Sequence, residues 1–284
     1  MNLFKSFSIA DLQIVFSWIS TQINIKFTDQ LKIFSNSNSS KDFYEIQIQI
    51  LNKKVLFKNK HDWVINKISS ECYSFKLKSI NSDYLRVELI FSLNNKTWNL
   101  FYYNFEENSL VDFNPFIHPL GTIILQNILI QNNGFFIHGS AINFNGNGLI
   151  FTGKSGNGKT TISEIFNNAG TQVIHDDRLI IRKIQDTFYM FNSPMINVEE
   201  TRQSEINAVF SIYHNSKNSV NKLSGIETYR NIVPNIIQHN VDKEFVSIIS
   251  DTYSDFIKRY PVYSLGFVPD KNIIPFISDI ISKQ

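Results

Sequence analysis

Residues Gly148 to Thr161 read GLIFTGKSGNGKTT, and this stretch decides the expected fold of the chain. Its centre, Gly153 to Thr160, fits the pattern G-x-x-x-x-G-K-[ST] of a phosphate-binding loop. An apolar run precedes it and apolar residues at helical spacing follow it, so the sequence predicts a strand, a loop and a helix in that order. The pattern arises by chance in about one chain of this length in a hundred. The alternative is a glycine-rich turn followed by a helix.

The residue types of the loop suit a triphosphate. Glycines leave room for backbone N–H groups to approach phosphate oxygens, and the start of a helix attracts the same anion. Lys159 would place its ammonium on the β- and γ-phosphates, and the Thr160 hydroxyl would hold Mg²⁺. The sequence therefore predicts binding of ATP, or another nucleoside triphosphate, together with Mg²⁺. The expected nucleotide-binding residues are Gly153, Lys154, Ser155, Gly156, Asn157, Gly158, Lys159, Thr160 and Thr161.

Composition narrows the class of protein. The chain has 284 residues, enough for two ordinary domains, and its 43% hydrophobic residues exclude general disorder. The net charge is +2 with no basic run, so no nucleic-acid surface is expected. The single Cys72 excludes an internal disulfide, fits a reducing cytoplasm, and is better read as a small buried or half-buried residue than as a catalyst. The apolar N-terminal stretch is too short to span a bilayer, so we expect a cytoplasmic protein without a membrane partner.

Two domains are expected. Residues 1–118 alternate apolar and polar positions, most clearly over 44–50, 85–93 and 98–105, which predicts a β-rich domain for substrate recognition or regulation. Residues 119–284 form the expected nucleotide-binding domain, with a mixed α/β (α+β) sheet and a helix over 123–129. Two apolar runs around NGNG predict a hairpin that leads directly into the loop. This is unusual, because a parallel crossover precedes the loop strand in common phosphate-loop proteins.

Downstream of the loop the pattern predicts alternating strands and helices. TQVIHDD reads as a short buried strand that ends in Asp176 and Asp177, and LIIRKIQDTFYMF reads as a separate hairpin. Ser224 and Glu227 fit a capping box before a helix that Pro234 interrupts. Two further helices are expected around residues 245–260 and 273–281.

The acidic pair and one histidine are the candidates for chemistry. Asp176 and Asp177 lie about one helix and one strand after Lys159, a distance that returns the chain beside the loop. Neighbouring strand residues face opposite sides, so one carboxylate should reach Mg²⁺ and the other the acceptor hydroxyl. The alternative is a turn-forming pair. His138 is equally consistent with a core residue and a catalyst. No His/Cys/Asp set has zinc-ligand spacing.

The run HGSAINFNGNGLIFTGKSGNGKTT, followed by a helix ending in glycine and by VIHDDRLII, resembles the C-terminal catalytic domain of HPr kinase/phosphorylase. The resemblance covers roughly residues 121–182. It implies the phosphoenolpyruvate-carboxykinase-like fold, whose mixed sheet accounts for the hairpin. It also implies His138 and Asp176 at the acceptor hydroxyl, with Asp176 as general base, and Asp177 and Thr160 on Mg²⁺. The family precedent is a homo-oligomer, in that case a hexamer.

The chain departs from this family after the acidic pair. Kinases that act on HPr carry a glycine-containing signature like EIRGxGIIxV, where this chain reads FNSPMINVEETRQSEINAVF. HPr as substrate and reverse phosphorolysis are therefore less expected. The N-terminal domain resembles, loosely, that of diverged kinases encoded beside peptide-modification genes, including those that phosphorylate lasso-peptide precursors. That resemblance implies a Ser/Thr hydroxyl on a peptide or protein as the acceptor.

Three functions remain open at this point: a peptide or protein kinase, a small-molecule kinase on the same core, and a non-catalytic nucleotide-dependent switch. The acidic pair and His138 favour transfer, because a switch needs no acceptor-side base. Arg202 is the expected source of positive charge at the transferred group, or else a solvated surface arginine. Glu199 and Glu200 could add a metal ligand. The remaining cations of this half include Arg178, Lys222, Arg230 and Arg259.

Overall fold

The computed structural model describes residues 2–19, 24–35, 42–104, 110–196, 198–239 and 242–283. The chain divides into two compact units, each with its own sheet. Unit 1 comprises Met1–Ile128 together with Pro194–Glu199, and unit 2 comprises Leu129–Ser193 and Glu200–Gln284. The division falls after Ile128 instead of after residue 118, and one short later segment joins the first unit. Within unit 1 the Thr122 hydroxyl donates to the Met195 sulfur at 3.6 Å, which ties that segment to this unit.

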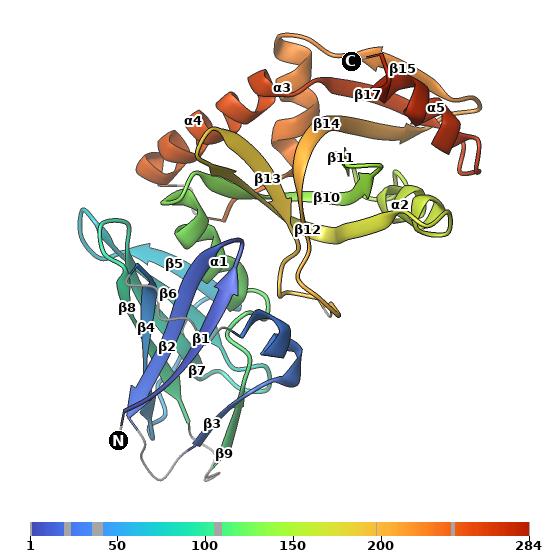
Figure 1. Ribbon diagram of the computed structural model, residues 1–284. Helices are drawn as coiled ribbons and strands as arrows, with labels where there is room; N and C mark the ends of the chain where they lie inside the picture. The colour runs from blue at the N-terminus through green and yellow to red at the C-terminus, as the bar shows by residue number, and fades with distance from the viewer. Residues whose placement is uncertain are drawn as a thin grey trace. The chain divides into compact units, whose positions relative to one another are not determined.

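Unit 1 is β-rich, with a seven-stranded mixed sheet in the order β1-β2-β4-β8-β7-β6-β5 (Figure 1). Its strands are β1 Asn2–Ile9, β2 Leu12–Ile19, β4 Tyr44–Leu51, β5 Trp63–Lys67, β6 Cys72–Lys78, β7 Leu85–Ser92 and β8 Thr97–Tyr103. A two-stranded parallel sheet pairs β3 Asn24–Phe27 with β9 Leu110–Phe113, and a short 3-10 helix covers Asp29–Phe34. The strand expected over 98–105 ends at Tyr103, and Phe105 lies outside the described residues.

Alternation of apolar and polar residues builds the sheet of unit 1. In β7 the residues Leu85, Val87, Leu89 and Phe91 are all buried, while the residues between them are only partly buried. The apolar N-terminal stretch is the hairpin β1–β2, whose turn at Ala10 and Asp11 has φ angles of 50° and 57°. No helix in the described ranges has the length and apolar character to cross a membrane.

Unit 2 is built on an eight-stranded mixed sheet in the order β11-β10-β12-β13-β14-β17-β15, with β16 paired to β10. Its strands are β10 Gly134–Phe144, β11 Asn147–Thr152, β12 Gln172–Ile184, β13 Thr187–Phe191, β14 Gln203–His214, β15 Ser219–Lys222, β16 Ile236–Ile237 and β17 Val262–Phe267. The expected hairpin is β10–β11, which turns at Asn145 and Gly146 with φ angles of 54° and 84°. β14 pairs with β13 at its start and in parallel with β11 further on, so the pairings of five strands close into a ring.

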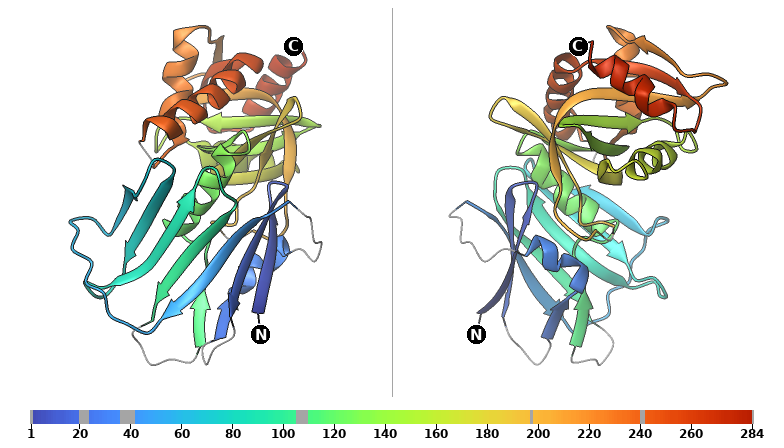
Figure 2. Two further views of the ribbon diagram at one scale, coloured as in Figure 1. Left: turned by 90° about the vertical axis from the view of Figure 1, so that its left-hand side faces the viewer. Right: turned by 45° about the vertical axis from the view of Figure 1, so that its right-hand side comes forward.

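Helices cover both faces of this sheet (Figures 1 and 2). They are α2 Lys159–Asn167, α3 Ile226–Ile232, α4 Lys243–Arg259 and α5 Ile273–Ile281, while α1 Leu120–Ile130 crosses the boundary between the units. Helices α2 and α5 share one apolar cluster with one face of the strands, in which Phe151, Phe166 and Ile277 are fully buried. On the other face Phe256 of α4 packs edge-on against Phe135, with ring centroids 5.4 Å apart.

Two local expectations are wrong. β12 does not end at the acidic pair but runs on through it to Ile184, as the first arm of the hairpin with β13. Asp177 has a φ of 94°, which interrupts the alternation without ending the strand. The capping box at Ser224 does not form, because Gly225 (φ 52°) occupies the N-cap of α3 and no side chain caps it. Pro234 lies in a 3-10 turn, Val233–Asn235, that ends this helix.

Candidate active site

The loop between β11 and α2 has the geometry expected of an anion cradle. Lys154, Ser155 and Gly156 are exposed, and α2 begins after Gly158 with no side-chain cap on its first N–H groups. Gly156 has a φ of 83°, and a Cβ added there would meet nothing within 4 Å. The space beside it is therefore open to a ligand that approaches the backbone. A helix N-terminus that lacks its own cap and faces open space suits a phosphate group.

A backbone carbonyl and a histidine of β14, together with one ring of β17, brace this loop. Asn157 donates its side-chain amide to the Ile212 carbonyl at 2.8 Å, and His214 Nε2 lies 2.9 Å from the Gly156 carbonyl. The His214 ring stacks on Phe267 at 5.8 Å between centroids. These contacts could not be found from the sequence, because His214 and Phe267 lie more than 50 residues after the loop and belong to no motif.

Lys159 lies at the first position of α2 with its ammonium folded back on the loop. Its Nζ donates to the carbonyls of Gly153 and Lys154 at 3.1 and 3.2 Å, and the residue is 8% exposed. Burial lowers the pKa of Lys159, and the nearby carboxylates Asp176 and Asp177 oppose this shift. A partly desolvated ammonium that donates to two neutral carbonyls is suited to exchange them for an anion.

The acidic pair reaches the loop through its first member. Thr160 Oγ1 donates a 2.6 Å hydrogen bond to Asp176 Oδ2, and the Thr160 residue is exposed. The resemblance implied that Asp177, and not Asp176, would share the metal with Thr160. A threonine hydroxyl and a carboxylate oxygen in contact form the hard-oxygen pair that Mg²⁺ prefers, with water and phosphate oxygens to complete its shell. These two residues therefore fit a magnesium ion.

The second carboxylate lies beside the histidine. His138 Nε2 is 3.5 Å from Asp177 Oδ1, and Arg178 Nη1 is 3.3 Å from Asp177 Oδ2. The side chains of His138 and Asp177 are each 42% exposed, so both are open to a reactant. Burial, followed by the charge of Lys159, lowers the pKa of His138 below 6.5, which keeps its imidazole neutral at pH 7. The resemblance grouped His138 with Asp176, and the contacts group it with Asp177.

The register of β10 and β12 and the unusual φ of Asp177 together explain this division of the acidic pair. β10 and β12 pair Ser140 with Asp176, Gly139 with Asp177 and His138 with Arg178. Directly paired residues share a face, so the register alone places His138 and Arg178 on the face of Ser140 and Asp176, and Asp177 on the opposite face. The φ of 94° at Asp177 interrupts this alternation, and its carboxylate contacts His138 and Arg178.

Arg202 has partners away from the loop. Its Nη1 donates to the Val173 carbonyl at 2.6 Å, and its Nε pairs with Glu200 at 2.9 Å. Val173 precedes Asp176 by three strand positions, about 10 Å along the chain. Arg178 does contact the acidic pair, at Asp177, and its signal in the sequence was its position directly after that residue. Glu199 and Glu200 are exposed.

His175, directly before the acidic pair, is structural. It is 2% exposed, its Nε2 lies 3.0 Å from the Ser193 hydroxyl, and burial lowers its pKa to about 4. In the described part of the chain, no group of three or more His, Cys, Asp and Glu side chains could hold a metal ion by itself.

No family model matches the chain, and no curated protein matches its sequence. A match among solved structures is the HPr(Ser) kinase/phosphatase from Coxiella burnetii, with 11% sequence identity and a TM-score of 0.29. The match covers 52% of this chain and 94% of that one. This is a weak structural likeness to a kinase, and at such a TM-score it carries no argument about activity. The function has to be inferred from the contacts at the loop.

Proposed function

We propose that the protein is a kinase that transfers the γ-phosphoryl group of ATP to a Ser or Thr hydroxyl of a peptide or protein. The observation that carries this proposal is the hydrogen bond between Thr160, at the start of the loop helix, and Asp176. It joins a phosphate-loop hydroxyl to a carboxylate, and a second carboxylate, Asp177, lies next to it with His138. A switch that only bound nucleotide would not need the second carboxylate.

The nucleotide would be held by the loop and by the start of α2. Backbone N–H groups from Gly153 to Thr161 surround the phosphates, and Lys159 exchanges its two carbonyl partners for phosphate oxygens. Thr160 and Asp176 would hold Mg²⁺, which neutralises charge that develops on the phosphate oxygens.

Transfer itself is assigned to the second carboxylate. Asp177 accepts the proton of the acceptor hydroxyl while the hydroxyl oxygen forms its bond to the γ-phosphorus and the bond to the bridging oxygen of ADP breaks. His138, neutral at pH 7, orients Asp177, and Arg178 offers positive charge beside it. In this proposal the two aspartates exchange the roles that the resemblance implied: Asp176 serves the metal, and Asp177 is the base.

A substitution at each aspartate separates these roles. Asp177→Asn should lower kcat by about 10²–10⁴-fold with the Mg²⁺ requirement unchanged, because only proton removal is lost. Asp176→Asn should raise the Mg²⁺ concentration needed for half-maximal rate, because a metal ligand is lost. Both should still bind the nucleotide, measured with a fluorescent ATP analogue. The reverse pattern, in which Asp176→Asn abolishes transfer at saturating Mg²⁺ and Asp177→Asn shifts the Mg²⁺ requirement, would restore the roles implied by the resemblance.

The acceptor class rests on the resemblance of the N-terminal region to kinases of peptide-modification clusters. It is tested by incubating the protein with γ-labelled ATP, Mg²⁺ and peptides encoded near it, and by locating the label. Label on a Ser or Thr of a peptide supports the proposal. Label on a small molecule, or release of free phosphate alone with every acceptor, favours the small-molecule kinase or the switch.

A further inference from the structure

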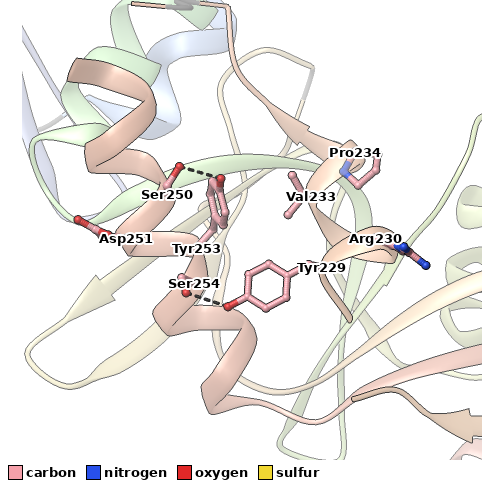
Figure 3. Close-up of a pocket in the computed structure, with 8 residues that line it drawn as sticks. All are labelled: Tyr229, Arg230, Val233, Pro234, Ser250, Asp251, Tyr253 and Ser254. Carbon is pink, nitrogen blue, oxygen red and sulfur yellow. Dashed lines mark hydrogen bonds between the residues drawn. The ribbon is translucent and has the colours of Figure 1, made fainter. Parts of the chain in front are cut away.

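A groove lies between α3 and α4 of unit 2, separate from the loop. It consists of two adjoining hollows of about 880 and 580 Å³, and Tyr229 of α3 lines both. We refer to the two together as the α3–α4 groove. The larger hollow is enclosed by the start of α3, the end of α4, the start of β17 and the end of α5. The smaller one is shown in Figure 3.

The larger hollow is basic. Four cationic side chains line it and no acidic one does: Lys222, Lys258, Arg259 and Lys283. Arg259 is already engaged by Asp186 and Asp255 at 3.1 and 3.6 Å. For the three lysines, which are exposed, the described residues contain no ion-pair partner. Three unpaired ammonium groups around one hollow create a positive potential that an anionic ligand would relieve.

Acidic residues do occur on the same elements, but they do not line the basic hollow. They are Glu227 of α3, Glu244, Asp251 and Asp255 of α4, and Asp279 of α5. Asp255 pairs with Lys183 at 2.7 Å, and Asp251 lines the smaller hollow. The positive charge of the larger hollow is therefore not balanced from its own walls.

The smaller hollow is lined by hydroxyl groups. The Tyr229 hydroxyl lies 2.8 Å from Ser254 Oγ, and Ser250 Oγ lies 2.8 Å from the Tyr253 hydroxyl (Figure 3). Hydroxyls both donate and accept hydrogen bonds, so they suit the N–H and C=O groups of an extended backbone. Aromatic rings between them give apolar contact with side chains.

Contacts along α3 give the groove a direction. Leu223, before the helix, donates to the Val262 carbonyl at the start of β17, at the basic end. Asn231, at the other end of α3, accepts from the Ser211 hydroxyl at 3.1 Å, and Ser211 pairs with Thr152, the residue before the loop. Because Val262 pairs with Val209, the Asn231 end of α3 lies two strand positions, about 7 Å, nearer to the loop end of the sheet than the basic end does.

We propose that the α3–α4 groove binds an acidic segment of the peptide or protein substrate. This inference rests on the proposed kinase function and names the chemistry of its substrate. Glutamates or aspartates of the segment pair with Lys222, Lys258 and Lys283, and the backbone that follows them runs along the hydroxyl groups toward the phosphate loop. Such a contact would hold the acceptor residue near the loop without touching the reacting atoms.

The test measures binding of labelled peptides to the full chain by fluorescence polarisation. The probes are a short peptide in which Glu alternates with Gly and Ser, and its counterpart with every Glu replaced by Gln. The acidic peptide should bind more tightly, and its affinity should fall as salt is added. The double variant Lys222→Glu/Lys258→Glu should weaken this binding at least about tenfold. The double variant Lys222→Arg/Lys258→Arg, which keeps the charge, should restore it.

Lys243→Glu is the matched control, because Lys243 is an exposed lysine at the opposite end of α4. This substitution should leave the peptide affinity unchanged. All of these variants should bind the fluorescent ATP analogue normally. If the parent chain binds the acidic peptide but not the ATP analogue, the kinase function is overturned, while the proposal that the groove binds an acidic segment still stands. Equal affinity for the Glu and Gln peptides, or undiminished binding by the Lys→Glu pair, would overturn the groove. Tighter binding of a single-stranded DNA oligomer or of anionic vesicles through the same lysines would also overturn it.

Discussion

The imidazole of His175 is enclosed by the fold one residue before the acidic pair. With 2% of the residue exposed, a charged imidazole would lose its hydration, and burial accordingly lowers its pKa to about 4. Above about pH 6.5 the imidazole is neutral in both the folded and the unfolded chain, so its contribution to stability does not change. Between pH 6.5 and 4 the unfolded chain binds a proton that the folded chain excludes.

Stability of unit 2 should therefore fall as the pH drops from 6.5 toward 4. A shift from 6.5 to about 4 corresponds to about 3 kcal/mol of unfolding free energy. His175→Gln should remove much of this pH dependence, measured by urea unfolding followed by circular dichroism at a series of pH values. His61→Gln, at an exposed histidine of unit 1, is the control and should leave the dependence intact. An unchanged pH dependence in His175→Gln would contradict the assignment.

At this scale the sequence predicted individual residues better than their partners. The loop motif placed Lys159 and Thr160 at the start of a helix, because a motif fixes residues that are adjacent in the chain. The contacts Thr160–Asp176 and His138–Asp177 depend on how β10 and β12 are paired and on the φ of Asp177, neither of which has a local signal. The contacts of Arg202 with Val173 and Glu200, and of Arg178 with Asp177, likewise depend on strand pairing and have no local signal.

At the scale of elements, the position of the loop depends on the close approach of β11 to β14. A Cβ added at Gly148 would lie 1.8 Å from the Glu205 carbonyl oxygen, so only glycine permits this approach. Gly146 in the same hairpin has a φ of 84° but nothing within 4 Å of an added Cβ. Substitution of Gly148 therefore tests a steric clash between strands, whereas substitution of Gly146 tests only the strain of a positive φ.

Gly148→Ala should lower the free energy of unfolding by about 3 kcal/mol or more, because the backbone of β11 must move away from β14. Gly146→Ala should cost only about 1 kcal/mol, the strain of a positive φ on alanine. Urea unfolding of both variants provides the comparison. Equal losses in the two variants would mean that the contact between β11 and β14 is not as close as described.

The contact between His214 and Gly156 links the end of β14 to the phosphate loop. Loss of one hydrogen bond of about 1 kcal/mol should weaken nucleotide binding about fivefold in His214→Ala. His214→Gln keeps a donor and should recover most of the affinity. A fluorescent ATP analogue measures both variants, with kcat expected to change less than the dissociation constant. If the glutamine variant does not recover binding, the stacking of the His214 ring on Phe267, and not the hydrogen bond, supports the loop.

For the whole molecule, hydrophobic periodicity predicted the β-rich first part and the mixed α/β second part. It also predicted the helices near residues 245–260 and 273–281, because their apolar spacing is regular over several turns. The closed ring of strands did not follow, because β14 changes partner from β13 to β11 along its length. The continuation of β12 through Asp176 and Asp177 was also missed, since charged pairs usually mark the end of a buried strand.

The three tryptophans give a fluorescence probe of unit 1 alone. Trp18, Trp63 and Trp98 all belong to unit 1, whereas the phosphate loop belongs to unit 2. Each unit has its own buried core, so we expect their unfolding transitions to be separable. Mg²⁺ and ATP at about 100 times the dissociation constant should stabilise unit 2 by about 2.7 kcal/mol, which raises its transition temperature by about 5–10 °C.

In this experiment thermal unfolding is followed by tryptophan fluorescence and by circular dichroism on the same sample. The nucleotide should shift the circular-dichroism transition of unit 2 and leave the tryptophan transition where it is, because only unit 2 gains binding free energy. Lys159→Ala, which removes the ammonium from the loop, should abolish the shift. A nucleotide-dependent shift of the tryptophan signal in the parent chain would show instead that the two units unfold as one, and that unit 1 responds to what the loop binds.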